Sequence, residues 1–213
     1  MNVSNNIISE DLDHIFNSTA SMWNELRDKQ LFLTGATGFF GTWLLESFIE
    51  ANKKLDLNAK VVVLTRNLDA FQKQSPHICS NRAIRFHIGD VRNYEFPKGT
   101  FSHIIHGATT SATETFNKQD PLIKYDIIAE GTRHTLEFAV YCNCEKFLLT
   151  SSASAYGKQP LEISHISEDF NGAPYTTDKN FDHSVLGEAK RTSELLTTIY
   201  SDKYGIETKI ARC

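Results

Sequence analysis

The sequence contains no long apolar run, no basic cluster and no zinc-binding arrangement of cysteines. No apolar stretch approaches the roughly 18 residues that cross a bilayer, and the first residues, MNVSNNIISEDLD, lack the basic and apolar segments of a secretory signal. Lys and Arg total 22 against 26 Asp and Glu, and this argues against nucleic acid, because neutralising phosphates requires a basic face. We therefore expect a cytoplasmic protein with no membrane or nucleic-acid partner.

The four cysteines form a single C-x-C pair with no second pair at zinc-site spacing. We interpret them as ordinary reduced thiols and expect no metal site, and a reactive or metal-binding role is the alternative. They are Cys79, Cys142, Cys144 and Cys213.

Short apolar runs alternate with helical periodicity along most of the chain. We predict strands at 30–35, 60–65, 83–88, 101–106, 146–150 and 206–211, helices at 42–52, 121–141 and 185–204, one or two short helices within 9–27, and surface connections at 53–60 and 71–81. Because strands alternate with helices, the sheet should be parallel and covered on both faces, as in a doubly wound α/β Rossmann fold. We divide the chain into an N-terminal helical extension, 1–29, and a dinucleotide-binding domain, 30–213.

Three glycines lie between the first predicted strand and the first helix, in the spacing G-x-x-G-x-x-G. Gly35 allows a tight turn, Gly38 lets the backbone approach a pyrophosphate, and Gly41 lets the helix pack closely on the strand. The positive end of the helix then faces the phosphates. The predicted cofactor-binding residues of this loop are Gly35, Thr37, Gly38, Phe39, Phe40 and Gly41.

The second predicted strand ends without the acidic residue that commonly holds the adenosine ribose hydroxyls. Its last residues are Leu64-Thr65-Arg66-Asn67. A guanidinium suits a 2′-phosphate, so Arg66 favours NADP over NAD. A solvated arginine at a strand end is an equal alternative, and the cofactor is therefore NAD or NADP.

The glycine spacing resembles that of the short-chain dehydrogenase/reductase superfamily. The segment TSSASAYG, 150–157, resembles the T-S-S-x-x-V-Y-G stretch of its extended members, the NAD(P)-dependent nucleotide-sugar epimerases and dehydratases. The resemblance covers nearly all of the chain from about Gln30. It implies that Asp90 and Val91 meet the adenine. It also implies that small residues leave room for the cofactor at Gly107, Ala108 and Thr109.

By position, the resemblance makes Ser152 the hydroxyl that hydrogen-bonds the reacting sugar oxygen and stabilises negative charge there. Lys190 stands in a K-x-x-x-E-x-L context and would hold the nicotinamide ribose and lower the pKa of a tyrosine. The family places that tyrosine four residues earlier, where this chain has Leu186, which cannot transfer a proton. A literal Y-x-x-x-K occurs upstream, from Tyr175 to Lys179, and Tyr175 is the alternative proton carrier.

Other positions also depart from the family. Ala153 and Ser154 replace the Asp-Glu pair of sugar 4,6-dehydratases, so elimination is not expected, and Ile128 stands where N-x-x-G-T usually has asparagine. Extended members continue into a small substrate domain that we expect to be absent from this chain, and the sequence is either cut from a longer chain or naturally truncated.

The resemblance implies an oxidoreductase that transfers a hydride at a carbon of a nucleotide-linked sugar, with a homodimer left open. The alternative is a catalytically impaired cofactor-binding protein, a regulator or assembly partner, because Leu186 replaces the expected tyrosine. A reductase of a non-sugar carbonyl is a third interpretation.

Overall fold

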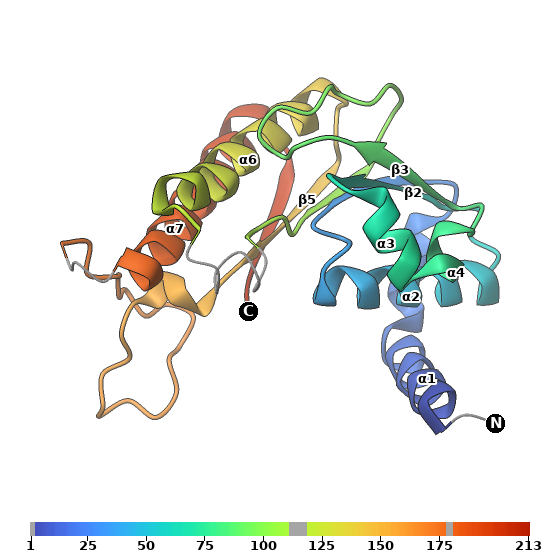
Figure 1. The fold of residues 1–213 in the computed structure, drawn as a ribbon, viewed down its shortest axis with the longest axis horizontal. Helices are drawn as coiled ribbons and strands as arrows, with labels where there is room; N and C mark the ends of the chain where they lie inside the picture. The colour runs from blue at the N-terminus through green and yellow to red at the C-terminus, as the bar shows by residue number, and fades with distance from the viewer. Residues whose placement is uncertain (1–2, 111–118, 178–180) are drawn as a thin grey trace.

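The computed structural model describes residues 3–110, 119–177 and 181–213, which form a parallel six-stranded sheet flanked by helices (Figure 1). The strands are β1 (Gln30–Thr34), β2 (Lys60–Thr65), β3 (Ile84–Ile88), β4 (His103–His106), β5 (Lys146–Ser151) and β6 (Glu207–Arg212). The helices are α1 (Val3–Trp23), α2 (Phe39–Lys54), α3 (Leu68–Gln74), α4 (Pro76–Cys79), α6 (Pro121–Tyr141) and α7 (Phe181–Tyr204), with 3-10 turns η1 (Asn24–Leu26) and η2 (Ala153–Tyr156).

The strand order is β3-β2-β1-β4-β5-β6, so the predicted doubly wound topology is confirmed. β1 pairs on one side with β2 and on the other with β4. The chain therefore winds outward from β1 to β3 and then crosses back to β4. Folds of this kind bind ligands at such a switch point, outside the carboxyl ends of the strands. Here the switch point lies between the segments that follow β1 and β4.

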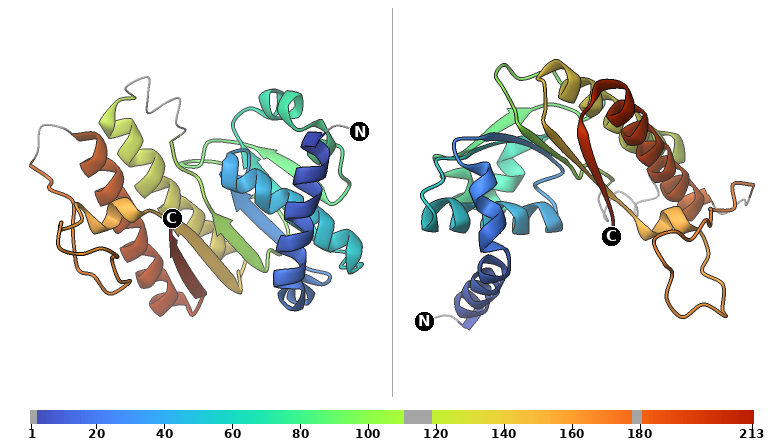
Figure 2. Two further views of the ribbon diagram at one scale, coloured as in Figure 1. Left: turned by 90° about the horizontal axis from the view of Figure 1, so that it is seen from below. Right: turned by 180° about the vertical axis from the view of Figure 1, so that it is seen from behind.

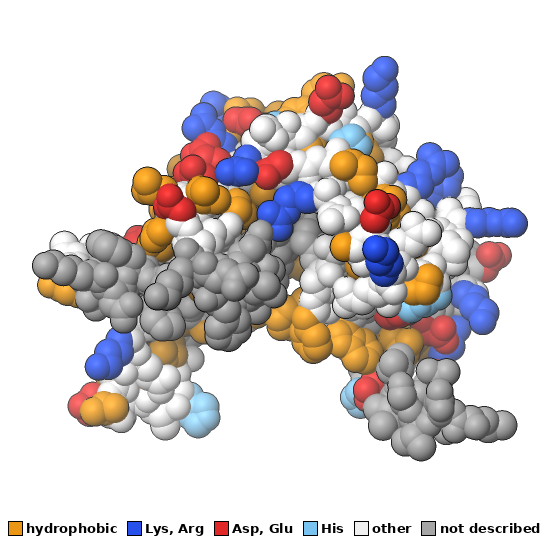
Figure 3. Space-filling view, viewed as in Figure 1, with side chains coloured by type: hydrophobic (Ala, Val, Ile, Leu, Met, Phe, Trp, Pro, Cys, Tyr) orange, Lys and Arg blue, Asp and Glu red, His pale blue; other side chains and the backbone are white. Residues whose placement is uncertain are grey.

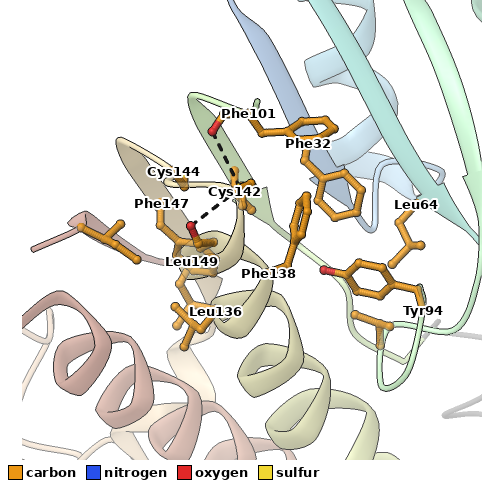
Figure 4. Close-up of a cluster of buried hydrophobic side chains, with 14 of the residues drawn as sticks. Phe32, Leu64, Tyr94, Phe101, Leu136, Phe138, Cys142, Cys144, Phe147 and Leu149 are labelled. Atoms are coloured by element: carbon orange, nitrogen blue, oxygen red, sulfur yellow. Dashed lines mark hydrogen bonds between the residues drawn. The ribbon is translucent and has the colours of Figure 1, made fainter. Parts of the chain in front are cut away.

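Alternate residues of β1 point to opposite faces of the sheet, as the pleat of a strand requires. Phe32 is fully buried on the α6 side, where its ring centroid lies 4.8 Å from that of Phe138 (Figure 4). Leu31 and Leu33 enter a second cluster with Phe48 of α2. The β1 strand is thus buried on both sides, which explains its short and continuous apolar sequence.

Residues 71–81, predicted as a surface connection, instead contain most of α3 and all of α4. Asn67 caps α3 by accepting a hydrogen bond from the Ala70 N–H at 3.0 Å, and Pro76 begins α4. Phe71 and Ile78 are 3% and 0% exposed. The prediction was wrong because each helix is too short to show a periodic pattern.

The predicted cover on both faces is complete only for part of the sheet. The helices α6 and α7 pack along one face of β4–β6, whereas no helix of the described residues covers the opposite face of these strands (Figure 2). Ile105 and Leu148 line a cavity there, and Ile210 of β6 is 39% exposed. This uncovered face is continuous with the site described below.

The helix predicted at 121–141 has the predicted bounds, while α2 and α7 begin earlier than predicted. The segment 9–27 contains the greater part of one long helix, α1, which ends at Trp23, followed by the 3-10 turn η1. The helix α1 packs on α2, and Lys54 of α2 binds Asp13 of α1 at 2.6 Å. The separation of 1–29 as its own extension stays a prediction. No described helix is long and apolar enough to cross a membrane.

Candidate functional site

Packing within the protein requires glycine at two positions of the loop between β1 and α2. Gly35 has φ +72°, and a Cβ there would lie 2.3 Å from the carbonyl oxygen of Gly107. A Cβ at Gly41 would lie 2.2 Å from the Cα of Ala36. Because both obstacles are backbone, neither position accepts a side chain, and the loop stays tight against β4.

Gly38 differs from these two glycines. It is the N-cap of α2, with φ −87° and ψ −176°, and a Cβ there would meet only the Gly35 carbonyl oxygen at 3.4 Å, an ordinary contact. The space beside Gly38 is therefore not filled by protein. A bare backbone at a helix N-terminus fits a phosphate group, because unsatisfied N–H groups and the helix dipole both favour negative charge there.

A cavity of about 300 Å³ opens beside the loop, at the carboxyl ends of the first four strands. Its lining includes every residue predicted to contact the cofactor except Lys190: Gly35, Thr37, Gly38, Phe39, Phe40, Gly41, Arg66, Asp90, Val91, Gly107, Ala108 and Thr109. Four separate segments thus meet where the sequence predicted a dinucleotide. The arrangement fits such a cofactor in its shape and in its exposed backbone groups.

Phe39 and Phe40 begin α2 at the rim of this cavity. Their side chains are 75% and 62% exposed and contact each other edge to face, with ring centroids 5.5 Å apart. In the space-filling view, hydrophobic side chains gather along the underside of the molecule, in the region where α2 lies (Figure 3). The cavity is therefore bordered by the backbone of the first turn of α2 and by two exposed aromatic side chains.

Charged groups are concentrated at the end of the cavity formed by β2 and β3. Arg92 binds the Asp90 carboxylate in a bidentate pair, with Nε and Nη2 each 2.9 Å from an oxygen. The hydrogen bond from Arg92 lowers the pKa of Asp90, and the charge of Arg66 lowers it further. Asp90 is therefore ionised and held in place, and the exposed guanidinium of Arg66 lines the same cavity.

A larger cavity, of about 790 Å³, adjoins the first and shares the loop residues Gly35, Gly107 and Thr109 with it. It extends over the ends of β4 and β5 and along the uncovered sheet face. Ser152, Leu186 and Lys190 all line it. The structure thus brings the predicted catalytic serine and lysine, and the leucine in the tyrosine position, next to the predicted cofactor cavity.

Ser152 follows β5 directly and caps the short turn η2. Its Oγ accepts a hydrogen bond from the Ser154 N–H at 3.2 Å. Because the backbone supplies the proton of this bond, the hydroxyl hydrogen of Ser152 remains available to a ligand oxygen.

Lys190 lies on α7 and is only 4% exposed. Its Nζ donates to the carbonyl oxygen of Thr150 at 2.7 Å, and this bond ties α7 to the end of β5. Burial lowers the pKa of Lys190 to about 8. The ammonium is thus held at the cavity wall and releases its proton more readily than an exposed lysine.

His106, at the end of β4, connects the glycine loop to the α6–α7 layer. Its Nδ1 lies 2.9 Å from Thr34 Oγ1, and its Nε2 lies 3.1 Å from Thr132 Oγ1, which in turn bonds Ser193 of α7 at 2.9 Å. Complete burial lowers the pKa of His106 to about 3, so the ring is neutral. This chain of hydrogen bonds fixes the two cavities relative to each other.

The structure does not bring Tyr175 into the site. Its side chain is 73% exposed and lines neither cavity, while its backbone carbonyl accepts a hydrogen bond from Ser184 Oγ at 2.7 Å. Lys179, the second half of that motif, lies outside the described residues. Leu186 is partly buried and lines the larger cavity one turn before Lys190, as the family register predicts.

Lys124 is a cavity residue that the sequence analysis missed. It lies on α6, is 3% exposed and lines the larger cavity. Its position could have been found from the helix pattern, because Lys124 falls on the stripe of buried residues that continues through Ile127, Ile128 and Gly131. A lysine on such a stripe is unusual, since buried charges require a partner.

The four cysteines are free thiols. Cys142 ends α6, with its Sγ directed at the carbonyl oxygens of Phe101 and Ala139 (Figure 4). Burial raises the pKa of Cys142 to about 11 and that of Cys144 to about 12, so both are poor nucleophiles at neutral pH. Within the described ranges, no group of three His, Cys, Asp or Glu side chains could hold a metal ion.

Comparisons with known proteins agree with this geometry. The sequence model of the NAD dependent epimerase/dehydratase family matches residues 31–213. A UDP-glucose 4-epimerase of Rickettsia canadensis is 38% identical over 144 residues, covering 66% of this chain and 41% of the relative. A UDP-glucose 4-epimerase of Pisum sativum is 28% identical over 151 residues, covering 67% of this chain and 41% of the relative.

Among solved structures, a UDP-glucuronic acid 4-epimerase of Bacillus cereus, in complex with UDP-glucuronic acid and NAD, has a TM-score of 0.70 at 22% identity. The aligned region covers 86% of this chain and 55% of the solved structure. At this identity the likeness shows the fold alone. The chain spans about two fifths of the curated relatives, 41% of each of the two named above. The family match extends over nearly the whole sequence, and the chain belongs to the NAD-dependent epimerase/dehydratase family of extended short-chain dehydrogenases/reductases.

Proposed function

We propose that the protein is an NAD(P)-dependent oxidoreductase that moves a hydride between the nicotinamide and a carbon of a nucleotide-linked sugar, in the manner of a 4-epimerase. The observation that carries this proposal is the direct junction of two cavities. One has the glycine loop that suits a dinucleotide, and the other holds Ser152 and Lys190. The relatives named UDP-glucose 4-epimerase support a nucleotide-sugar substrate.

The chain's own residues would orient the reactants. Ser152 would donate its hydroxyl hydrogen to the reacting sugar oxygen and stabilise negative charge there. Lys190, already held by Thr150, would bind the nicotinamide ribose. The bound cofactor would supply reversible hydride acceptance. Preorganised donors of this kind need little rearrangement when charge develops.

The proton on the sugar oxygen requires a carrier, and Leu186 in the cavity cannot be one. Water or a rearranged Tyr175 would take this role. The presence of Leu186 in the tyrosine position favours a second candidate function, a protein that binds the cofactor without catalysing a reaction. The comparisons do not favour this second function, because the relatives that they name are enzymes.

Two finer points belong to the same proposal. The family name points to NAD, whereas the position of Arg66 at the adenosine end of the cavity favours binding of a 2′-phosphate. We propose that the site accepts both cofactors with a preference for NADP. A cytoplasmic location and a homodimer stay predictions from the sequence.

The test is to incubate the intact protein with NAD or NADP and with UDP-glucose, and to follow the absorbance of reduced nicotinamide and the formation of the epimer. We expect cofactor reduction or epimer formation in the wild type and a large loss in Ser152→Ala. Lys98→Met, at an exposed loop position, is the matched control. Absence of cofactor binding in the folded wild type would refute the proposal.

A further inference from the structure

Two side chains of α7, one helical turn apart, tie this helix to the carboxyl end of β5. Lys190 Nζ donates to the Thr150 carbonyl oxygen at 2.7 Å. Glu194 Oε1 accepts a hydrogen bond from Ser151 Oγ at 2.5 Å. The two α7 side chains lie on one helix face, because residues four apart in a helix are neighbours on its surface. Both bonds therefore act on the residues that lead directly into Ser152.

The carboxylate of Glu194 also binds the neighbouring strand β6. Its two oxygens accept hydrogen bonds from Nε and Nη2 of Arg212, at 2.9 and 2.7 Å. Ser151 and Arg212 are partners in the register of β5 and β6, so one carboxylate joins two strands to the helix that covers them (Figure 2). The Glu194 side chain is 13% exposed. Burial alone would raise its pKa, but the hydrogen bonds from Arg212 and Ser151 lower the pKa below its usual value, so the group is ionised.

Arg212 extends this connection to the turn that follows Ser152. Its guanidinium carbon lies 4.4 Å from the ring centroid of Tyr156, which is within the range of a cation–π contact. Tyr156 is the last residue of η2, and Ser152 caps this turn at its beginning. Glu194 is thus connected directly to the residue before Ser152 and, through Arg212, to the turn after it.

Glu194 lies outside both cavities, although the residues that it holds do not. Ser151, Ser152 and Lys190 all line the larger cavity, whereas Glu194 lines neither cavity. An effect of Glu194 on a bound ligand would therefore pass through these neighbours. Donors that are already held in place bind better than mobile ones, because less conformational entropy is lost on binding.

We propose that Glu194 is a positioning residue, which holds the Ser152 hydroxyl and the Lys190 ammonium in fixed places relative to each other and so prepares the cavity for the nicotinamide end of the cofactor. This inference rests on the proposed function and adds a residue to it. Its consequence is selective. Loss of the Glu194 carboxylate loosens the end of β5 and weakens binding of the nicotinamide half, while the glycine loop between β1 and α2 keeps its affinity for the other half.

The first measurement is amide hydrogen exchange of the intact protein without cofactor, followed by mass spectrometry of its peptides. Exchange reports local opening, so Glu194→Ala should exchange faster than the wild type at 150–157 and at the wild-type rate at 30–41. Glu194→Gln should stay close to the wild type, because its amide oxygen can still accept a hydrogen bond from Ser151. Asp202→Asn removes an exposed acid from the same helix and should change neither segment.

The second measurement compares the dissociation constants of NADH and ADP by calorimetry. ADP has the adenosine and diphosphate groups but no nicotinamide, so it reports on the smaller cavity. Glu194→Ala should weaken NADH by about tenfold, the value of about one hydrogen bond, and leave ADP unchanged. Lys190→Met should also weaken NADH. Adding Glu194→Ala to Lys190→Met should then cost little more, because both changes remove the same contact.

Three outcomes would overturn the proposal. The first is wild-type exchange at 150–157 in a folded Glu194→Ala protein, or in Ser151→Ala, which removes the same bond, if the glutamate variant does not fold. The second is an equal change in the affinities for NADH and ADP, including no change in either. The third is a fully additive loss in the double variant. Faster exchange confined to 150–157, in a protein that binds neither ligand, would support the role of Glu194 and refute the proposed function instead.

Discussion

The two halves of the sheet form their parts of the site in different ways. In the β1–β3 half, which we call the backbone half, the smaller cavity lies beside the glycine loop, where Gly35 and Gly41 stand in places that no side chain fits. In the β4–β6 half, which we call the reaction half, individual side chains line the larger cavity. They are Ser152 after β5, Lys190 of α7 and Lys124 of α6. Backbone geometry admits few substitutions, whereas exchanging a single cavity side chain such as Leu186 can change the chemistry that we propose while the fold is kept.

The largest expected effect concerns the backbone half. In Gly38→Val, the added side chain would fill the space that the cofactor pyrophosphate requires. We expect NAD(H) and NADP(H) to raise the melting temperature of the wild type, since a ligand of the native state stabilises it by mass action. The same titration should give no shift in Gly38→Val.

Gly41→Val provides the contrast to this variant. A side chain there meets the backbone of Ala36, so the melting temperature of the cofactor-free protein should itself fall. The cofactor-free Gly38→Val protein should keep the wild-type value. If both variants were destabilised equally, the distinction between a binding glycine and a packing glycine would be wrong.

The second prediction concerns the reaction half. Leu186→Tyr places a phenol one turn before Lys190 and in the same cavity as Ser152. A general acid/base contributes about two to four orders of magnitude to a rate, and we expect a gain approaching this range in steady-state turnover of the intact protein. Tyr175→Phe in the same background should change little. Strong activity in the wild type that Tyr175→Phe abolishes would contradict the assigned register.

The third prediction uses the buried Lys190. Burial lowers its pKa from 10.5 to about 8, so the unfolded chain binds more protons than the native protein between these pH values. The free energy of unfolding should therefore rise with pH in this window, by about 3 kcal/mol from this group. Denaturant titrations of wild type and Lys190→Met should show this rise only in the wild type. Parallel pH profiles would mean that Lys190 is solvated.

The smallest expected effect concerns cofactor choice. Arg66 lines the smaller cavity at the end where we propose that the adenosine binds, and it lies close enough to Asp90 to lower the pKa of that carboxyl. Arg66→Ala should weaken NADPH relative to NADH by about tenfold, about 1.4 kcal/mol. Fluorescence titration of both cofactors gives the ratio, and an unchanged ratio would show that Arg66 does not contact the 2′-phosphate.

Much of the backbone half could be predicted from sequence because its demands are local. A short apolar strand, three spaced glycines and a helix follow one another within 30–54, and each has a pattern of its own. The helix at 121–141 was also predicted correctly, with Pro121 marking its start and a long periodic stretch behind it. The hydrogen-bond network around His106 joins residues that are far apart in the chain, so no local sequence pattern could predict it.

The reaction half was harder to predict because its features depend on burial and on what packs where. Lys124 was missed although it falls on the apolar stripe of α6, because a lysine in a helix is usually exposed. The open face of β4–β6 could not be foreseen from strands whose apolar residues suggest full cover. Tyr175 matched a motif in spacing alone, and its exposed position shows why spacing without helical context is weak.

The central claim is that one dinucleotide spans the two cavities, with its pyrophosphate at Gly38 and its nicotinamide beside Ser152 and Leu186. The most direct measurement is a crystal structure of the intact protein with NAD. The account predicts phosphate oxygens on the first-turn N–H groups of α2 and the nicotinamide ribose on Lys190. A cofactor bound elsewhere, or with its nicotinamide turned away from Ser152, would contradict it.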